Sequence, residues 1–363
     1  MRTPEDAEKA SIARGLLLDQ TEKHANYPSY FTFYQSIFCP EEEHGTIIQI
    51  DNPVLSSHGD ILRCASHIRA NAQQTQEVLG RTLFPGNTVS HRDRHDAIHS
   101  TIRVMFMLDC FLKDKFSPNY EVSDYSPARW EAHEPLVTYV ERAIPKDPMQ
   151  RISDFQPHKA MYKEALKAWE LKKRCHLQFL PTNNIMEHLL YDPRTRTVQI
   201  FHHTAYLSAH LRHAKGQPLD QSASESLKMG MLPPQLLLET LHTIHSILFP
   251  IMNDKTGKSS ELLKDLIAKH GFDPNAIWDT GLISDGFRYQ YWNQRLEILY
   301  RLVINPPPRN RLARWVERHT SERNALTVAL IALFLNAFFG MMACLIGGAQ
   351  LAIAILAWKD QEK

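Results

Sequence analysis

NALTVALIALFLNAFFGMMACLIGGAQLAIAILAW, residues 324–358, contains no charged side chain. A helix that spans a bilayer needs about 20 apolar residues, and about 18 without a charge already indicate one. A buried helix of a globular domain is usually much shorter. We therefore predict that residues 325–358 form a transmembrane segment.

The length of this segment leaves the number of passes open. A single helix would be about 50 Å long, whereas the hydrocarbon core of a bilayer is about 30 Å thick. A helical hairpin that turns near Asn336–Met341 would use the length better, and we favour it. Small or amide residues recur at spacings of three and four, which lets helices pack closely in lipid, within a hairpin or by self-association. This stripe comprises Ala325, Ala329, Ala332, Asn336, Gly340, Ala343, Gly347, Gln350, Ala354 and Ala357, and Trp358 follows it.

Basic residues flank the segment unequally. Two lysines, Lys359 and Lys363, follow it, and five arginines precede it: Arg309, Arg311, Arg314, Arg318 and Arg323. This excess predicts that the large N-terminal part is cytosolic. The N-terminus, MRTPEDAEKASIARG, lacks the apolar core of a secretory signal. The sequence does not identify the organelle.

A basic amphipathic stretch lies just before the membrane segment. Leu312, Trp315, Val316 and His319 would share one face of a helix over 309–324. Such a helix would lie at the lipid headgroups, with Trp315, Arg318 and Arg323 as interfacial residues. Alternatively, these residues are the first turns of the spanning helix.

Composition limits the class of the remaining chain. The 363 residues carry 41 Lys+Arg and 40 Asp+Glu, a net charge of +1, with 43% hydrophobic residues. These values are ordinary for a folded protein, and the near-zero charge argues against a nucleic-acid partner. The five cysteines form no CxxC pair. This excludes a disulfide framework and suits a reducing compartment.

Hydrophobic periodicity predicts a fold that is mostly α with a small β element (α+β). Apolar faces indicate helices around 98–112, 160–178, 234–249 and 290–304. β-branched runs indicate a strand at 46–50 and a hairpin of strands 185–191 and 197–201. The predicted parts are a flexible segment 1–20, a helical cytosolic domain 21–305, a proline-rich linker with the basic helix 306–324, the membrane segment 325–358 and a tail 359–363.

Histidine is abundant, and its densest cluster is His91, His95 and His99. This spacing would place three imidazoles on one helical face, where they could bind a transition metal. We identify no fourth ligand, so the expected arrangement is a polar helix start with ordinary histidines. The sequence therefore predicts neither a metal site nor a cofactor.

Four residues are the best candidates for catalysis: Asp109, His188, His202 and Glu261. Asn253-Asp254-x-x-Gly257-x-x-x-Glu261 resembles a permissive second magnesium motif of class I terpene synthases. In that family, an asparagine, a hydroxyl residue and a glutamate hold Mg²⁺. Asp109 and Asp114 would be the aspartate-rich motif, but their spacing differs from DDxxD and Gly257 replaces the hydroxyl. We therefore expect no magnesium here.

A basic run of Lys159, Lys163, Lys167, Lys172, Lys173 and Arg174 lies within one predicted helix. A solvated helix face explains such a run. The alternative is contact with anionic lipid headgroups.

Several phrases resemble an uncharacterised family of filamentous-fungal proteins. They are IRVMFMLDC (102–110), LPTNNIMEHL (180–189), VQIFHH (198–203), LPPQLLLET (232–240), LFP (248–250) and ERHTSERN (317–324). The resemblance implies a fungal source, a cytosolic body and a C-terminal membrane anchor. It implies no activity and no functional residues.

Two functions remain open at this stage. One is a non-enzymatic binding or accessory module anchored in a membrane. Its partners would be membrane lipid and a protein, or a second copy through the small-residue stripe. The other is a membrane-associated enzyme that acts on an apolar small molecule, as in fungal secondary metabolism. The enzyme should bring the catalytic candidates together in a buried cleft.

Overall fold

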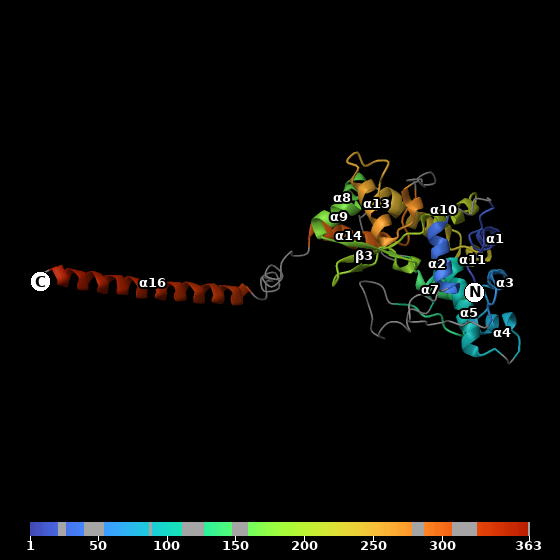
Figure 1. Ribbon diagram of the computed structural model, residues 1–363, viewed down its shortest axis with the longest axis horizontal. Coiled ribbons are helices and arrows are strands. Elements are labelled where there is room, and N and C mark those ends of the chain that lie inside the picture. Colours follow the sequence, from blue (N-terminus) through green and yellow to red (C-terminus); the bar gives the residue numbers. More distant parts are fainter. Residues whose placement is uncertain are drawn as a thin grey trace. The chain divides into compact units, whose positions relative to one another are not determined.

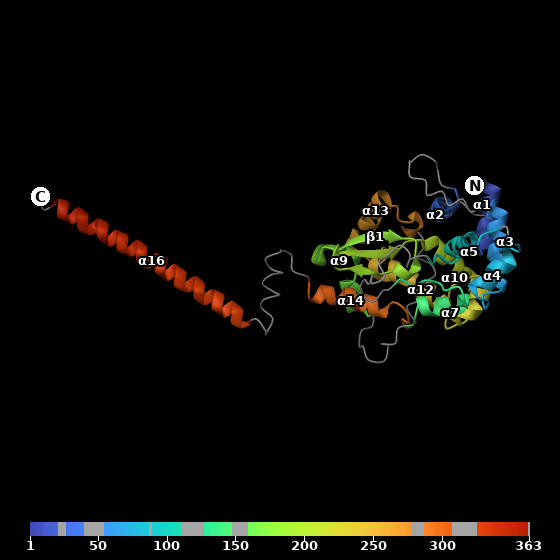
Figure 2. The same ribbon diagram turned by 90° about the horizontal axis from the view of Figure 1, so that it is seen from below.

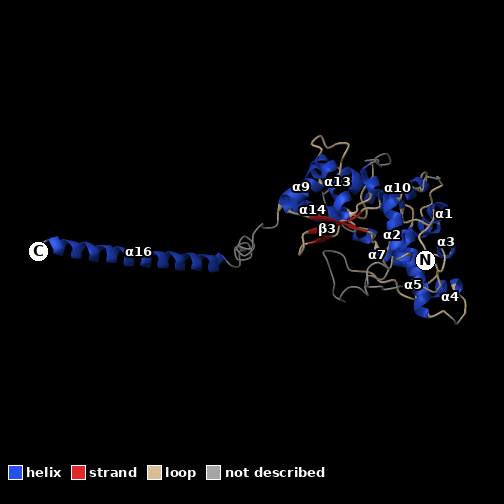
Figure 3. Ribbon diagram, viewed as in Figure 1, coloured by secondary structure: helices blue, strands red, loops and turns tan. Residues whose placement is uncertain are grey.

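The computed structural model describes residues 1–20, 27–39, 54–86, 89–110, 127–146, 159–277, 287–306 and 325–361. The chain forms two units, Met1–Asn305 and Pro306–Lys363. Unit 1 contains helices and a small sheet, and unit 2 contains one long helix (Figures 1 and 3). This confirms the predicted class, mostly α with a small β element and a C-terminal apolar helix.

The elements of the first half of unit 1 are α1 (Asp6–Leu16), α2 (Pro28–Phe38), α3 (His58–Ala70), α4 (Gln76–Leu83), α5 (His91–Phe106), α7 (Leu136–Ala143), α8 (Ala160–Ala165) and α9 (Ala168–Cys175). The second half contains β1 (Gln178–Thr182), η3 (Ile185–Glu187), β2 (Tyr191–Asp192), β3 (Thr197–Phe201), α10 (Thr204–His213), α11 (Ala223–Lys228), α12 (Pro234–His242), η4 (Thr243–Leu248), α13 (Lys258–His270), η5 (Pro274–Ile277) and α14 (Asn293–Ile304). Figures 1 and 2 place α1, α3, α4 and α5 at one end of unit 1 and α9, α13 and α14 at the other.

The sheet has three strands in the order β1-β3-β2. β3 runs parallel to β1, with Gln178 opposite Thr197, and antiparallel to β2, with Tyr191 opposite Val198. The predicted strand 197–201 is therefore confirmed. Its antiparallel partner is shorter than predicted and overlaps the predicted strand at Tyr191, and β1 is an additional partner. Proline at position 181 weakened the strand signal of β1, although an edge strand tolerates proline.

The predicted strand at 185–191 is mostly wrong. Its first residues form the 3-10 turn η3, because the Asn184 side chain accepts the backbone N–H of Met186 (3.3 Å). Leu189 has a φ of +60°, which also breaks an extended chain. Tyr191 pairs with β3 as expected, and the backbone of Leu189 and Leu190 also hydrogen-bonds to Gln199 of β3. The predicted strand at 46–50 lies outside the described residues.

The core of unit 1 joins its two halves through aromatic and aliphatic side chains. Tyr30 and Tyr206 are stacked, with ring centroids 6.3 Å apart. Their hydroxyl groups donate to the backbone carbonyls of Val104 (3.0 Å) and Met105 (3.1 Å) at the end of α5. Each large apolar side chain buried in this way contributes about 1.5–3 kcal/mol.

The helix boundaries differ from those predicted. α5 begins at His91, because the Ser90 side chain accepts the backbone N–H of Asp93 (3.1 Å), and it ends where Met107 takes a left-handed conformation. The expected helix at 160–178 is two short helices, α8 and α9. The expected helix at 234–249 is α12 followed by the π-helical turn η4.

Residues 1–20 are part of unit 1, contrary to the flexible segment expected from sequence. Ile12, Leu16 and Leu17 are fully buried, so α1 contributes to the core. Gly15 permits the close approach of α3, since a Cβ there would lie 2.6 Å from Leu62 Cδ2. The sequence prediction failed because the polar start of this segment concealed a buried helical face.

Unit 2 contains α16 (Ala325–Gln361), a single helix of 37 residues. Its residues Ala329–Ile355 are long and apolar enough to cross a membrane. The favoured hairpin is therefore wrong, and the single helix is the alternative that holds. Gly340 lowers helix stability by only about 1 kcal/mol, and the segment has no proline to break the helix.

Candidate functional site

The surface of α16 is the first candidate site. The side chains from Ala329 to Ile355 are exposed, and those of Leu333, Phe334 and Phe339 are 65, 76 and 63% exposed. The predicted membrane residues Asn336, Gly340, Gly347 and Trp358 lie along this helix, which begins at Ala325. Exposed apolar surface in water is unfavourable by about 25 cal/mol per Å². A hydrocarbon environment is therefore the natural solvent for this helix.

A buried acid on α12, Glu239, is the second candidate site. Its Oε2 atom accepts the backbone N–H groups of Tyr291 (2.9 Å) and Trp292 (3.2 Å). Its Oε1 atom accepts the side-chain amide of Gln235 (2.6 Å) and the backbone N–H of Gln290. We call this arrangement the Glu239 clasp. It joins α12 to the start of α14, where the helix dipole favours a negative charge.

Two effects act in opposite directions on the pKa of Glu239. Burial raises the pKa of Glu239 to about 7, although its hydrogen bonds from Gln235 and from the backbone of 290–292 lower it. A buried glutamate with such a pKa is also typical of general acids and bases. Here the four donors come from the protein itself. The geometry is therefore that of a carboxylate that fastens one helix to another.

His188 is buried beside this clasp and has a fixed tautomer. Its Nδ1 atom accepts the backbone N–H of Phe201 (3.2 Å), so Nε2 carries the proton and donates to Thr243 Oγ1 (2.6 Å). The His188 carbonyl accepts a hydrogen bond from Arg295 Nη1 (2.7 Å). Burial lowers the pKa of His188 well below its usual value. The neutral ring thus links β3 to η4.

His202 lies at the same end of β3 but has different partners. The Nε2 atoms of His202 and His203 lie 3.3 and 2.7 Å from Asn183 Oδ1, and the two rings are 4.1 Å apart. Burial lowers the pKa of His202 to about 4. The buried Asp273 accepts the backbone N–H of Ala205 (3.1 Å) and so stabilises the start of α10. These groups connect the sheet to α10.

The other two catalytic candidates lie elsewhere. Asp109 is buried and forms an ion pair with Arg103, with 3.7 Å between the charged atoms. Glu261 is exposed in the first turn of α13. The structure therefore brings His188 and His202 near one strand end and gives Asp109 and Glu261 separate places.

The loop that resembles a magnesium motif has a structural role. Asp254 accepts the backbone N–H groups of Thr256 (3.0 Å) and Ser259 (2.8 Å). Burial alone would raise the pKa of Asp254, but hydrogen bonds from Ser259 and Thr256 hold it well below its usual range. Asp254 thereby stabilises the start of α13. Asp114, from the upstream motif, lies outside the described residues.

The three histidines of α5 share one face as predicted. The ring centroids of His91 and His95 are 4.1 Å apart, and those of His95 and His99 are 5.9 Å apart. His99 Nε2 lies within hydrogen-bond distance of the Gln76 side-chain amide. Burial lowers the pKa of His95 to about 4 and that of His99 to about 3. Within the described ranges, no group of three or more His, Cys, Asp or Glu residues could hold a metal ion.

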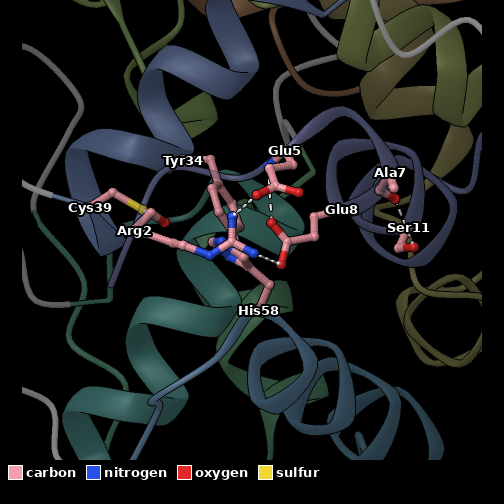
Figure 4. A network of polar contacts seen from close by, with 8 residues as sticks. All are labelled: Arg2, Glu5, Ala7, Glu8, Ser11, Tyr34, Cys39 and His58. Atoms are coloured by element: carbon pink, nitrogen blue, oxygen red, sulfur yellow. Dashed lines mark hydrogen bonds and ion pairs between the residues drawn. The ribbon is translucent and has the colours of Figure 1, made fainter.

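A further polar network fixes the N-terminal residues to α2 and α3 (Figure 4). The Arg2 guanidinium donates to Glu5 (2.7 Å) and Glu8 (3.0 Å). The Arg2 carbonyl lies 3.0 Å from the Cys39 thiol, and burial raises the pKa of that thiol. A cysteine in this state is a poor nucleophile. The network therefore stabilises the fold of the N-terminus.

Sequence reasoning missed Glu239, Gln235 and Arg295. A signal existed, since LLLETLH places one acid inside an apolar run, four residues after a glutamine. The partners of Glu239 at 290–292 lie about 50 residues further along the chain, and no local pattern indicates that pairing. The predicted interfacial residues Trp315, Arg318 and Arg323 lie outside the described residues.

No protein-family model, no curated protein and no solved structure matches this chain.

Proposed function

We propose that this chain is an integral membrane protein anchored by α16, with unit 1 as a cytosolic binding or accessory module. One observation carries the proposal. Residues Ala329–Ile355 form a helix long and apolar enough to span a bilayer, and none of that apolar window is buried by protein. A helix of 27 residues is about 40 Å long and fits a hydrocarbon core of about 30 Å when tilted.

Charge asymmetry supports the cytosolic orientation. Five arginines lie between 309 and 323, whereas two lysines follow the apolar segment. Positive residues near a membrane segment favour the cytosolic side. The four buried or partly buried cysteines of unit 1, all free, also suit a reducing compartment.

The structural roles of the polar residues favour a binding module. His188, His202 and Asp109 are each engaged by neighbouring protein groups, and Glu261 is exposed on another helix. The alternative enzyme would need several of them to face one substrate.

Carbonate extraction tests the anchor. Membranes that contain the full chain are washed at alkaline pH, and we expect the protein to stay in the pellet. A variant with Phe339→Arg and Leu345→Arg should move to the supernatant, because each central arginine costs about 2.5–3.5 kcal/mol on insertion. The matched control is Val78→Arg with Leu219→Arg, which alters exposed apolar residues of unit 1 and should stay in the pellet. Release of the unmodified chain would refute the anchor.

Protease protection tests the orientation. In sealed vesicles whose cytosolic face is outside, added protease should digest unit 1. Protection of unit 1 until detergent is added would reverse the proposed orientation without affecting the anchor.

A further inference from the structure

A basic cluster lies at the end of unit 1 where α14 finishes. It consists of Lys172 and Lys173 on α9 and of Lys255 and Lys258 around the start of α13, all exposed. Lys258 lies over the Trp169 ring, 4.4 Å from its centroid, which brings the start of α13 against α9. Since residues three and four apart share a helix face, Lys172 and Lys173 lie on the same side of α9 as Trp169. We call these four lysines the basic corner.

Acidic side chains around the basic corner are largely engaged by other cations. Glu170 pairs with Arg174 (2.8 Å), and Asp265, which Lys172 also influences, pairs with Lys269 (2.5 Å). Glu261 is exposed in the same region and offsets one charge. Within the part of the chain that the structure describes, Lys173 and Lys255 form no ion pair. The corner therefore keeps a surplus of positive charge.

Exposed apolar side chains accompany this charge. Met161 on α8, Met252 before α13 and Ile304 at the end of α14 are 63, 78 and 58% exposed. They are three of the six large apolar side chains that are exposed among the described residues of unit 1. Exposed apolar side chains beside lysines are typical of surfaces that contact lipid headgroups.

The basic corner adjoins the last helix before the anchor. α14 packs against α8 through Tyr162 and Tyr300, whose ring centroids are 4.7 Å apart. It also packs against α9, where the Cys175 thiol donates to the Leu302 carbonyl (3.2 Å). Figures 1 and 2 show α9 beside α14, and α9 also packs against α13. Residues 305–324 alone separate α14 from α16, a stretch that reaches at most about 70 Å.

We propose that the basic corner docks unit 1 on the anionic lipids of the membrane that holds α16. This inference rests on the proposed function, since the anchor keeps the corner close to a bilayer. Each lysine near an anionic surface strengthens binding by about fivefold. The four lysines less Glu261 and the ionised Asp254 leave a net surplus of two charges, which gives about 25-fold. The tether to α16 gives the basic corner an effective concentration in the millimolar range, at which even a weak lipid site would be mostly bound.

The test uses the full chain in two kinds of lipid disc. Neutral discs contain phosphatidylcholine alone, and anionic discs contain phosphatidylcholine with 30% phosphatidylserine. Exposed lysines are acylated by a water-soluble reagent, and their rates are read by mass spectrometry. We expect Lys172, Lys173 and Lys255 to react at least threefold more slowly in the anionic discs. Lys215 and Lys228, exposed elsewhere on unit 1, should react equally in both.

Charge reversal separates docking from general attraction. In Lys173→Glu with Lys255→Glu, Lys172 should regain its neutral-disc rate on anionic discs. The control Lys215→Glu with Lys228→Glu makes the same change of net charge and should leave Lys172 protected. Protection lost equally in both variants would overturn the proposal.

Two other outcomes also decide the matter. Equal rates in the two kinds of disc would refute lipid docking while the anchor stands, because the chain would still co-elute with the discs. Failure to enter either disc would refute the anchor instead. Protection on native membranes but not on protein-free anionic discs would assign the corner to an acidic protein and overturn the lipid proposal.

Discussion

Two leucine-rich helices, α12 in unit 1 and α16 in unit 2, place the same kind of side chain in opposite surroundings. In α12, Leu236, Leu237 and Leu241 are fully buried by neighbouring elements. In α16, Leu333 and Leu351 are 65 and 63% exposed. The core of unit 1 is therefore covered by the protein itself, whereas α16 needs a covering from outside. This contrast predicts which changes matter in each region.

Removal of the anchor should have the largest effect. Residues 1–308, expressed alone, should lose all membrane attachment and still melt in a single transition, because the helices of unit 1 bury one another's apolar faces. Fractionation and calorimetry measure the two properties. Two well-separated transitions, or a stable fragment 1–150, would show that unit 1 is two domains.

Acid should affect unit 1 next most strongly. Burial lowers the pKa values of His99, His202 and His210 to about 3, 4 and 3. An unfolded histidine has a pKa of about 6.5, so below that pH the unfolded chain binds more protons and stability falls as pH falls. From pH 7.5 to 5.5 each such histidine should lower the free energy of unfolding by roughly 1.3 kcal/mol. Denaturant titrations of the full chain in micelles measure this.

A single substitution tests the origin of the acid effect. Among the described residues, neither ring nitrogen of His210 has a hydrogen-bond partner, and the ring packs 4.3 Å from Tyr206. His210→Leu should therefore reduce the acid loss by roughly 1.3 kcal/mol and leave the rest. An unchanged loss would mean that other groups cause it.

Disruption of the Glu239 clasp should be somewhat milder. Glu239→Gln replaces one carboxylate oxygen by an amide group that faces backbone donors at 290–292, which leaves at least one of them unsatisfied. We expect a loss of about 3 kcal/mol. The control Glu261→Gln changes an exposed acid and should cost less than about 0.5 kcal/mol. Equal effects of the two substitutions would contradict the clasp.

Metal should have the smallest effect. An ion that binds only the folded state would raise Tm. Because we expect no metal site, zinc, nickel or a chelator should leave Tm unchanged within about 1 °C. His99 Nε2 is already within hydrogen-bond distance of Gln76, and His91 is exposed. A chelator-sensitive Tm that His95→Ala abolishes would contradict this prediction.

The contrast between the two helices also explains what the sequence could predict. α16 was predictable because the absence of charge over 35 residues has few explanations. The start of α12 at Pro233–Pro234 and the end of α14 before Pro306–Pro308 were predictable from another local signal, because proline is tolerated in the first turn of a helix and cannot continue one. The single pass was not, because helix continuity depends on backbone hydrogen bonds that apolar composition does not describe.

Contacts between distant residues account for most of what was missed. β1 forms a parallel pair with β3, and Pro181 concealed β1 as a strand in the sequence. The Glu239 clasp depends on backbone N–H groups at 290–292, which carry no side-chain signal. His188 was a catalytic candidate from sequence, and the structure shows its ring hydrogen-bonded to Thr243 and Phe201. A sequence can show that a polar residue lies in an apolar run. It does not show which distant group will be its hydrogen-bond partner.

The fastening of α14 also sets how unit 1 bears mechanical load. If α16 is anchored as proposed, tension on the chain would enter this helix at Ile304, its last residue. The ring contact of Tyr300 and the thiol hydrogen bond to Leu302 are loaded first and one at a time, as in peeling. The Glu239 clasp and Arg295 hold the opposite end, where several hydrogen bonds bear load together. Under such tension, the contacts of the final turns of α14 should therefore break before the Glu239 clasp does.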